Sequence, residues 1–120
     1  MERPVYKPIG TPVQELDTPA LVVDLAAMER NIEALLGLLP DGPPKLRPHV
    51  TSHKSPAVAH KQLAAGRTIG GISVYRVGEA EVFSRSGFTD ILIASQVVTT
   101  QKIARLCSLA RGTHMSVAAD

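Results

Sequence analysis

The sequence predicts an α/β protein made of about four and a half successive β/α units with parallel strands. Short apolar runs alternate with longer segments whose apolar residues recur at helical spacing. The expected strands begin near residues 20, 46, 71, 90 and 115, at intervals of roughly 19 to 26 residues, the length of a β/α unit with short loops. The apolar runs are continuous, which is typical of parallel strands covered on both faces.

The first unit follows an N-terminal arm. Residues 1–17 contain prolines at positions 4, 8 and 12 and no sustained apolar period, so we expect an arm there and the domain in residues 18–120. The first strand is expected over 20–24, and Asp24 can cap a helix whose apolar stripe runs from Met28 to Leu39. The cluster of proline and glycine over 40–44 should end that helix.

The second and third units carry clear helix boundaries. A strand over 46–50 is followed by Ser55 and Pro56, an N-cap and a proline at the first helical position, and this helix should run to about Gly66. The third strand, 71–74, precedes a helix over 78–86 that Gly87 should terminate.

The fourth unit has the clearest strand, over 90–94. Thr99 or Thr100 can cap the helix that continues to Arg111, and residues 115–119 begin a fifth strand. The single cysteine, Cys107, lies in an apolar stripe of that helix, so we expect a buried thiol.

Composition limits the class of protein. The chain has 120 residues, 13 basic and 11 acidic side chains spread along it and one cysteine, so it is the size of one domain with no clustered basic face for nucleic acid. No stretch approaches the ~18 apolar residues of a membrane span, and the N-terminus lacks the apolar run of a signal peptide. We expect a cytoplasmic protein with no nucleic-acid or membrane partner.

Two architectures fit this pattern. A five-stranded flavodoxin-like domain can be complete at about this length, whereas a full eight-fold TIM-like (β/α)8 barrel needs ~250 residues. Periodicity alone does not choose between a complete flavodoxin-like domain and the N-terminal portion of a barrel. Glycine-rich motifs for dinucleotides or nucleoside triphosphates are absent from the sequence.

One segment concentrates chemically useful side chains. Residues 47–54 contain an arginine, two histidines and a lysine where a parallel strand meets a helix, the end of an α/β sheet at which ligands bind. An anionic cofactor or substrate would be favoured there. The residues could equally be solvated charges and histidines that only hydrogen-bond to backbone. His49 and His53 straddle a strand end instead of lying on one helix face, so we predict no metal site.

Several motifs, in order, resemble the N-terminal part of the D-threonine aldolase and D-serine dehydratase family. The resemblance runs from about residue 15 to the end of the chain. The residues of one motif, 77–81, are more similar to the aldolase branch than to the dehydratase branch. The motifs are Glu15-Leu-Asp-Thr-Pro-Ala-Leu-Val-Val-Asp24, Glu29-Arg-Asn31, Leu46-Arg-Pro-His-Val50 with His53-Lys-Ser55, Val77-Gly-Glu-Ala-Glu81 and Asp90-Ile-Leu-Ile-Ala94.

The resemblance implies a pyridoxal phosphate enzyme of the alanine-racemase-like fold, with the cofactor at the mouth of a barrel. In this family a lysine forms an imine with the cofactor, and the ring withdraws electrons from the bond that breaks. An aldolase cleaves a D-3-hydroxy amino acid to glycine and an aldehyde, and a dehydratase expels the hydroxyl. The family also uses a divalent metal, whose ligands are in a C-terminal domain.

Two departures from the family pattern limit what it implies. The family motif reads His-Val-Lys-Thr-His-Lys, and an ungapped alignment places its imine-forming lysine on Thr51, with Lys54 three residues later as a candidate substitute. Phosphate-binding loops of such barrels come from late strands, which the 120 residues do not contain.

We therefore expect no catalysis by this chain alone, either as the N-terminal half of an aldolase-like enzyme or as a non-catalytic relative with at most weak cofactor binding. Open sheet edges could support a homo-oligomer. Arg47, His49, Ser73 and Gln96 are the candidate cofactor contacts, and Tyr75 is more simply a loop residue.

Overall fold

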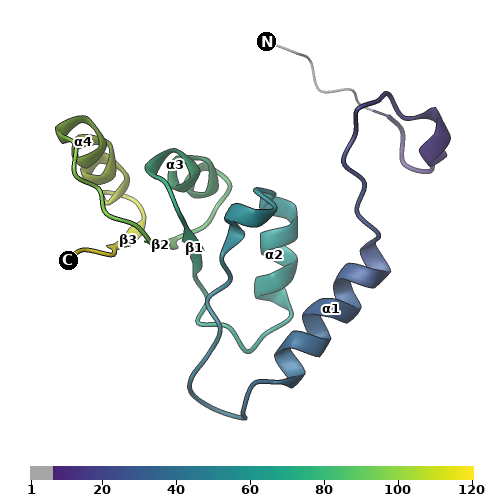
Figure 1. The fold of residues 1–120 in the computed structure, drawn as a ribbon, viewed down its shortest axis with the longest axis horizontal. Coiled ribbons are helices and arrows are strands. Elements are labelled where there is room, and N and C mark those ends of the chain that lie inside the picture. The colour runs from purple at the N-terminus through teal and green to yellow at the C-terminus, as the bar shows by residue number, and fades with distance from the viewer. Residues whose placement is uncertain (1–6) are drawn as a thin grey trace.

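A computed structural model describes residues 7–120 and confirms the α/β class (Figure 1). The helices and strands alternate from the middle of the chain onward. In order, the elements are η1 (Val13–Glu15), α1 (Leu25–Gly37), η2 (Val50–Ser52), α2 (Pro56–Ala64), β1 (Ile72–Val74), α3 (Val77–Arg85), β2 (Asp90–Ile93), α4 (Thr100–Leu109) and β3 (His114–Val117).

The three strands form one parallel sheet in the order β1-β2-β3. Ile91 of β2 lies between Ile72 and Met115 in the register of the sheet. The segment before η2 continues the sheet beyond β1 through two isolated parallel bridges, Leu46 to Thr68 and His49 to Ser73. The predicted strand at 46–50 is therefore present only as these two contacts.

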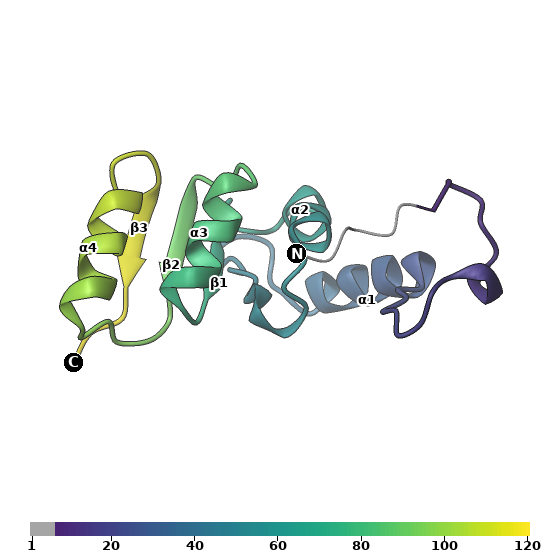
Figure 2. The same ribbon diagram turned by 90° about the horizontal axis from the view of Figure 1, so that it is seen from above.

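The helices that follow the strands lie on one face of the sheet. Figure 1 shows α3 and α4 on the same side of the strands, with α2 next to them, and Figure 2 shows the strands behind these helices. A flavodoxin-like domain reverses its strand order once, so helices cover both faces. The sequential order and the single helical layer show that the flavodoxin-like alternative is wrong.

The core lies between the sheet and this helical layer. Alternate strand residues face the helices, where Phe83 and Phe88 meet edge to face at 5.4 Å. The central residues are fully buried: Ile72, Val74, Ala80, Ile91 and Ile93. Burial of the β-branched strand residues against this layer aligns the carboxyl ends of the strands beside the first turns of the helices.

The predicted strand at 20–24 is wrong. This segment is extended but pairs with no strand, and Leu21, Val22 and Val23 are exposed. Figure 1 places it beyond α1, far from β1. Apolar content favours a strand only when a neighbouring strand accepts its backbone hydrogen bonds, and here no such neighbour lies beside it.

The helix boundaries follow the predicted caps. Asp24, Ser55 and Thr99 each accept a backbone N–H of the first turn of their helix, and Pro56 occupies the first position of α2. Gly87 adopts a φ of 91° just after α3, a conformation that favours glycine. No helix within residues 7–120 is long and apolar enough to cross a membrane.

The prediction of a buried Cys107 is wrong, because its side chain is exposed. The residues of α4 that pack against the core are Leu106 and Leu109. Cys107 therefore lies on the flank of the buried stripe.

Candidate functional site

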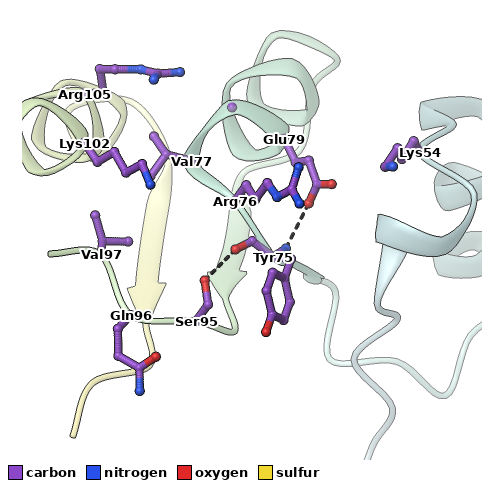
Figure 3. Close-up of a pocket in the computed structure, with 11 residues that line it drawn as sticks. Lys54, Tyr75, Arg76, Val77, Glu79, Ser95, Gln96, Val97, Lys102 and Arg105 are labelled. Carbon is purple, nitrogen blue, oxygen red and sulfur yellow. Dashed lines mark hydrogen bonds between the residues drawn. The ribbon is translucent and has the colours of Figure 1, made fainter. Parts of the chain in front are cut away.

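An open cleft of about 750 Å³ lies at the carboxyl ends of β1 and β2. Its walls are the segment before α2, the turn from β1 into α3, the turn after β2, and the first turns of α4. Figure 3 shows Ser95 and Gln96 on one side of Tyr75 and Glu79, with Lys54 on the other. Ligands of parallel α/β sheets bind at this end, so the cleft is the candidate site.

Thr51 lies at the edge of this site in a closed hydrogen-bond network. Its hydroxyl donates to Glu79 Oε2 at 2.8 Å and accepts the N–H of Tyr75 at 3.1 Å. The same N–H lies 2.9 Å from Glu79 Oε2. The network ties η2 to the turn at the end of β1.

Glu79 stays ionised in this network. Burial raises the pKa of its carboxyl, but hydrogen bonds from Thr51 and from the backbone of Tyr75 and Arg76, with the nearby charge of Lys54, lower it below the ordinary 4.5. Glu79 occupies the third position of α3 and accepts a hydrogen bond from the chain just before the helix, as in a capping box. The site therefore contains a fixed negative charge.

Lys54 faces Glu79 across the cleft in Figure 3. Its backbone has a φ of 53°, which only a few per cent of non-glycine residues adopt, and its N–H donates to Val50 O at 2.8 Å. This turn closes η2 and carries the exposed lysine side chain to the cleft.

His49 and Ser73 are paired by the bridge between the segment before η2 and β1. His49 is exposed, with its ring 6.4 Å from that of Tyr75, whereas Ser73 is buried in the sheet. His49 thus marks the last bridge between this segment and β1, and its ring lies near a residue of the cleft.

Gln96 and Ser95 form the far wall of the cleft. Ser95 Oγ donates to Tyr75 O at 2.5 Å, which joins the turns after β1 and β2. Gln96 Nε2 donates to Asp120 Oδ2 at 2.8 Å. Of the predicted site residues, the cleft contains Lys54 and Gln96, and Thr51 reaches it through Glu79.

Arg47 lies at the opposite, amino end of the strands. Its guanidinium makes two hydrogen bonds to Asp90, at 3.1 and 3.0 Å, and a third to Ile72 O. The hydrogen bond and charge of Arg47, joined by contacts from His114, lower the pKa of Asp90 despite the opposing effect of burial. The side chain of Arg47 here joins neighbouring strands, and a cofactor contact by Arg47 stays a prediction.

The histidines near the site have ordinary hydrogen-bond partners. His53 Nδ1 accepts the N–H of Ser55, so its Nε2 donates to Gln62 Oε1 at 3.2 Å. His60 stacks on Phe88 and donates to Ser86 O. Across the described part of the chain, no three His, Cys, Asp or Glu side chains gather as metal ligands would.

The residue at position 51, Thr51, does not fit a covalently anchored pyridoxal phosphate. A threonine hydroxyl cannot form an imine, and this hydroxyl is held by Glu79 and Tyr75. Lys54 also lines the cleft and carries an amine. However, it extends from the turn after η2 and not from position 51. The structure therefore supports no catalytic step through that cofactor.

Sequence reasoning overlooked Glu79, Arg76 and Lys102 as residues of the cleft. The signal for Glu79 was in the sequence, since an acidic residue at the third position of a helix reaches back to the preceding backbone. Arg76 and Lys102 have no local signal, because only the pairing of β1 with β2 brings α3 and α4 side by side.

Similar proteins were found in sequence and in structure, although no family model matches. The chain is 41% identical over 111 residues to the D-threonine aldolase of Arthrobacter sp, covering 92% of this chain and 29% of that protein. It is 35% identical over 112 residues to the 3-hydroxy-D-aspartate aldolase of Paracoccus denitrificans, with the same coverage of 92% and 29%. It is 40% identical over 105 residues to the D-threo-3-hydroxyaspartate dehydratase of a Delftia species, covering 88% of this chain and 27% of that protein.

The fold agrees with these relatives. The solved D-threonine aldolase of Filomicrobium marinum superposes with a TM-score of 0.82 and 41% identity over 90% of this chain and 29% of that one. The chain thus spans less than a third of the length of the proteins it matches. Over about nine tenths of its length the chain is similar in sequence and in fold to the N-terminal part of D-threonine aldolases.

Proposed function

We propose that this chain is the N-terminal part of a pyridoxal phosphate-dependent lyase of the D-threonine aldolase family that acts on D-3-hydroxy amino acids. In that role it supplies the first β/α units of a barrel and one wall of the site, and it does not catalyse retro-aldol cleavage alone. The observation that carries the proposal is the agreement of fold with a solved D-threonine aldolase over 90% of the chain.

A fusion protein tests this proposal. Residues 1–120 replace the matching N-terminal region of the Arthrobacter aldolase, and the fusion is made both unchanged and with Thr51→Lys. We expect both fusions to fold, and only the Thr51→Lys fusion to release glycine and an aldehyde from D-threonine. The reason is that a lysine amine, unlike a hydroxyl, can form the imine that the family chemistry requires.

The intact Arthrobacter aldolase serves as the positive control, and circular dichroism checks that each fusion is folded. Cleavage by the unchanged fusion would show that Thr51 does not remove activity. A folded but inactive Thr51→Lys fusion would show that position 51 is not the position of the anchoring lysine.

A second candidate is a non-catalytic relative that keeps the fold and at most weak cofactor binding. The hydrogen-bond network of Thr51, Glu79 and the Tyr75 N–H favours this candidate. These groups are hydrogen-bonded to one another, and position 51 carries a hydroxyl in place of an amine. Incubation of the chain with pyridoxal phosphate, reduction with borohydride and peptide mapping tests it, with Lys54→Arg as control. A specific label on Lys54 would contradict this candidate, and it predicts none.

The composition and the open sheet edges support two further proposals. The chain acts in the cytoplasm, and its partners are a small-molecule D-amino acid and copies of itself, with no nucleic acid or membrane. The divalent metal of the family would be held outside these 120 residues.

A further inference from the structure

Residues 20–23 form an extended apolar segment whose backbone has no partner in the single chain. Leu21 is fully exposed, and Val22 and Val23 are more than half exposed. No backbone–backbone hydrogen bond within residues 7–120 uses an N–H or C=O group of this segment. Apolar side chains on an unpaired extended backbone are the features of a strand that lacks its neighbour.

The strand β3 offers such a neighbour, because one of its edges is open. In the described part of the chain β3 pairs only with β2. The N–H groups of His114 and Ala118 donate toward β2, at 2.8 and 2.9 Å. Successive residues of a strand direct their backbone groups to opposite sides, so those of Met115 and Val117 point to the open edge.

An exposed apolar flank of α4 borders this edge of the sheet. Arg105 of α4 is bonded to Glu81 of α3, which identifies the flank of α4 that faces α3. Ile103, Cys107 and Ala110 recur at helical spacing on the other flank, and all three are exposed. The end of the sheet at β3 therefore combines free backbone groups with apolar side chains.

The unpaired segment and the open edge lie at opposite ends of the molecule. Figure 1 and Figure 2 both place α4 and β3 at one end and α1 with residues 7–24 at the other. The molecule extends 47 Å along its longest axis. A folded chain therefore cannot pair this segment with its own β3, and the neighbour has to be a second copy.

We propose that residues 20–23 of one copy add as a parallel strand to the open edge of β3 in a second copy. Addition of an extended segment to a free sheet edge is an established mode of recognition. A parallel orientation places α1, the helix that follows the segment, in the same layer as α4 and beside its apolar flank. This pairing deepens the proposal that copies of the chain are its partners, and it is independent of the lyase assignment.

The alternation of side chains sets the register of this pairing. The two residues that flank Ser116 pack against the core, so the Ser116 side chain points to the opposite face of the sheet. Burial of Leu21 and Val23 in the same layer as these core residues sets Val22 beside Ser116. Because a single chain leaves the segment unpaired, its amides should become protected only as the protein concentration rises.

Cross-linking between two single-cysteine variants tests the pairing. Both variants carry Cys107→Ala, one carries Val22→Cys and the other carries Ser116→Cys, so every cross-link joins two copies. An equal mixture is treated with a short bis-maleimide, and the linked peptides are identified by mass spectrometry. We expect the link between positions 22 and 116 to be the main product and to increase with protein concentration. Ser108→Cys, the same substitution at an exposed position of α4, replaces Ser116→Cys in the control mixture.

A second variant removes hydrogen bonds from the segment. Leu21→Pro with Val22→Pro deletes two consecutive N–H groups, one of which would face β3. Neither group is bonded to backbone in the single chain and the segment is extended, so the variant should fold. The dissociation constant measured by sedimentation should rise about tenfold, as for the loss of one hydrogen bond. Leu21→Val with Val22→Ile keeps both N–H groups and should associate as the unchanged chain does.

Two results would overturn the pairing. One is a link between positions 22 and 116 that is no more abundant than the link between positions 22 and 108. The other is an equal dissociation constant for the proline variant and the unchanged chain, with circular dichroism showing that both are folded. Self-association together with either result would mean that the copies meet through another surface, which leaves the proposed function standing.

Discussion

At the scale of single residues, Thr51 determines what this site can do. The relatives' chemistry, as the family resemblance implies it, requires an amine where Thr51 stands. The hydroxyl instead holds Glu79 and the Tyr75 N–H in place. A residue that the sequence marks as a missing catalytic group is, in the structure, a structural contact between η2 and α3.

Thr51→Val should raise the pKa of Glu79, because it removes a hydrogen bond to the ionised carboxylate while keeping the shape of the side chain. The loss of one such bond should lower the free energy of unfolding by about 1 kcal/mol at neutral pH. Thr51→Ser, which keeps the hydroxyl, is the control. An NMR titration of the Glu79 carboxyl that gave equal pKa values for Val and Thr at position 51 would contradict the network.

The sign of the pH dependence follows from the same group. The folded-state pKa of Glu79 lies below 4.5, so its contribution to stability is complete above that value and is lost as the pH falls through the folded pKa. Asp90, whose pKa is also lowered, acts in the same direction. Thr51→Val should therefore lose less stability than the unchanged chain as the pH falls through this acid range.

Gly71→Ala should destabilise the chain. A Cβ at this position would lie 2.4 Å from both Arg47 Nη1 and Asp90 Oδ2, so the ion pair that joins the strands must move. These atoms are the ends of two partly exposed side chains, so the cost is that of weakening their ion pair, about 1 kcal/mol, which denaturant unfolding measures. Gly37→Ala, at the end of α1 with nothing within 4 Å, is the matched control and should lose no stability. Equal stability of the two variants would contradict a close contact at Gly71.

At the scale of elements, local signals predicted the helices better than the strands. A helix satisfies its backbone within itself, so a cap such as Asp24 or Thr99 and an apolar stripe are sufficient to place it. A strand needs a neighbour. The predicted strand at 90–94 is therefore present as the central strand β2. The predicted strand at 46–50 is reduced to two isolated bridges, and the one at 20–24 pairs with no strand.

Hydrogen exchange should separate these elements. The amides of residues 21–23 pair with no strand and should exchange at nearly the rate of an unfolded chain, whereas the β2 amides, bonded on both sides, should exchange only on global unfolding. Measurement by NMR on the 15N-labelled chain gives both rates in one sample. Strong protection at 21–23 would show that this segment forms a strand in solution.

At the scale of the whole molecule, the chain is more extended than a compact domain. Its radius of gyration is 16.7 Å, compared with about 13.6 Å expected for 120 residues. Figure 1 shows the reason, since α1 and residues 7–24 extend away from the sheet. β3 is also an edge strand with no neighbour beyond it among the described residues.

Such an edge should promote self-association. We predict a sedimentation coefficient that rises with protein concentration, and a smaller rise for Ser116→Lys, which places a charge on β3. Ala104→Lys, on an exposed position of α4, is the control and should associate as the unchanged chain does. A monomer at every concentration would contradict association through the edge.

The sequence was sufficient to predict the α/β class and the parallel strands, because strand spacing and helix caps are local features. The cleft itself was not predictable. Glu79 and Arg76 lie near Lys54 only because the segment before η2 pairs with β1, and Lys102 joins them only after β1 pairs with β2. Arg47 is held at the far end of the strands by Asp90, a residue 43 positions away. Long-range pairing of this kind leaves no trace in a local pattern.

The most direct test of the central claim is to locate the imine in the fusion with the Arthrobacter aldolase. Pyridoxal phosphate is added, the adduct is reduced with borohydride, and the labelled peptide is sequenced by mass spectrometry. We predict a label at position 51 in the Thr51→Lys fusion and none in residues 47–54 of the unchanged fusion. A label on Lys54 of the unchanged fusion, or none at position 51 after Thr51→Lys, would contradict the claim.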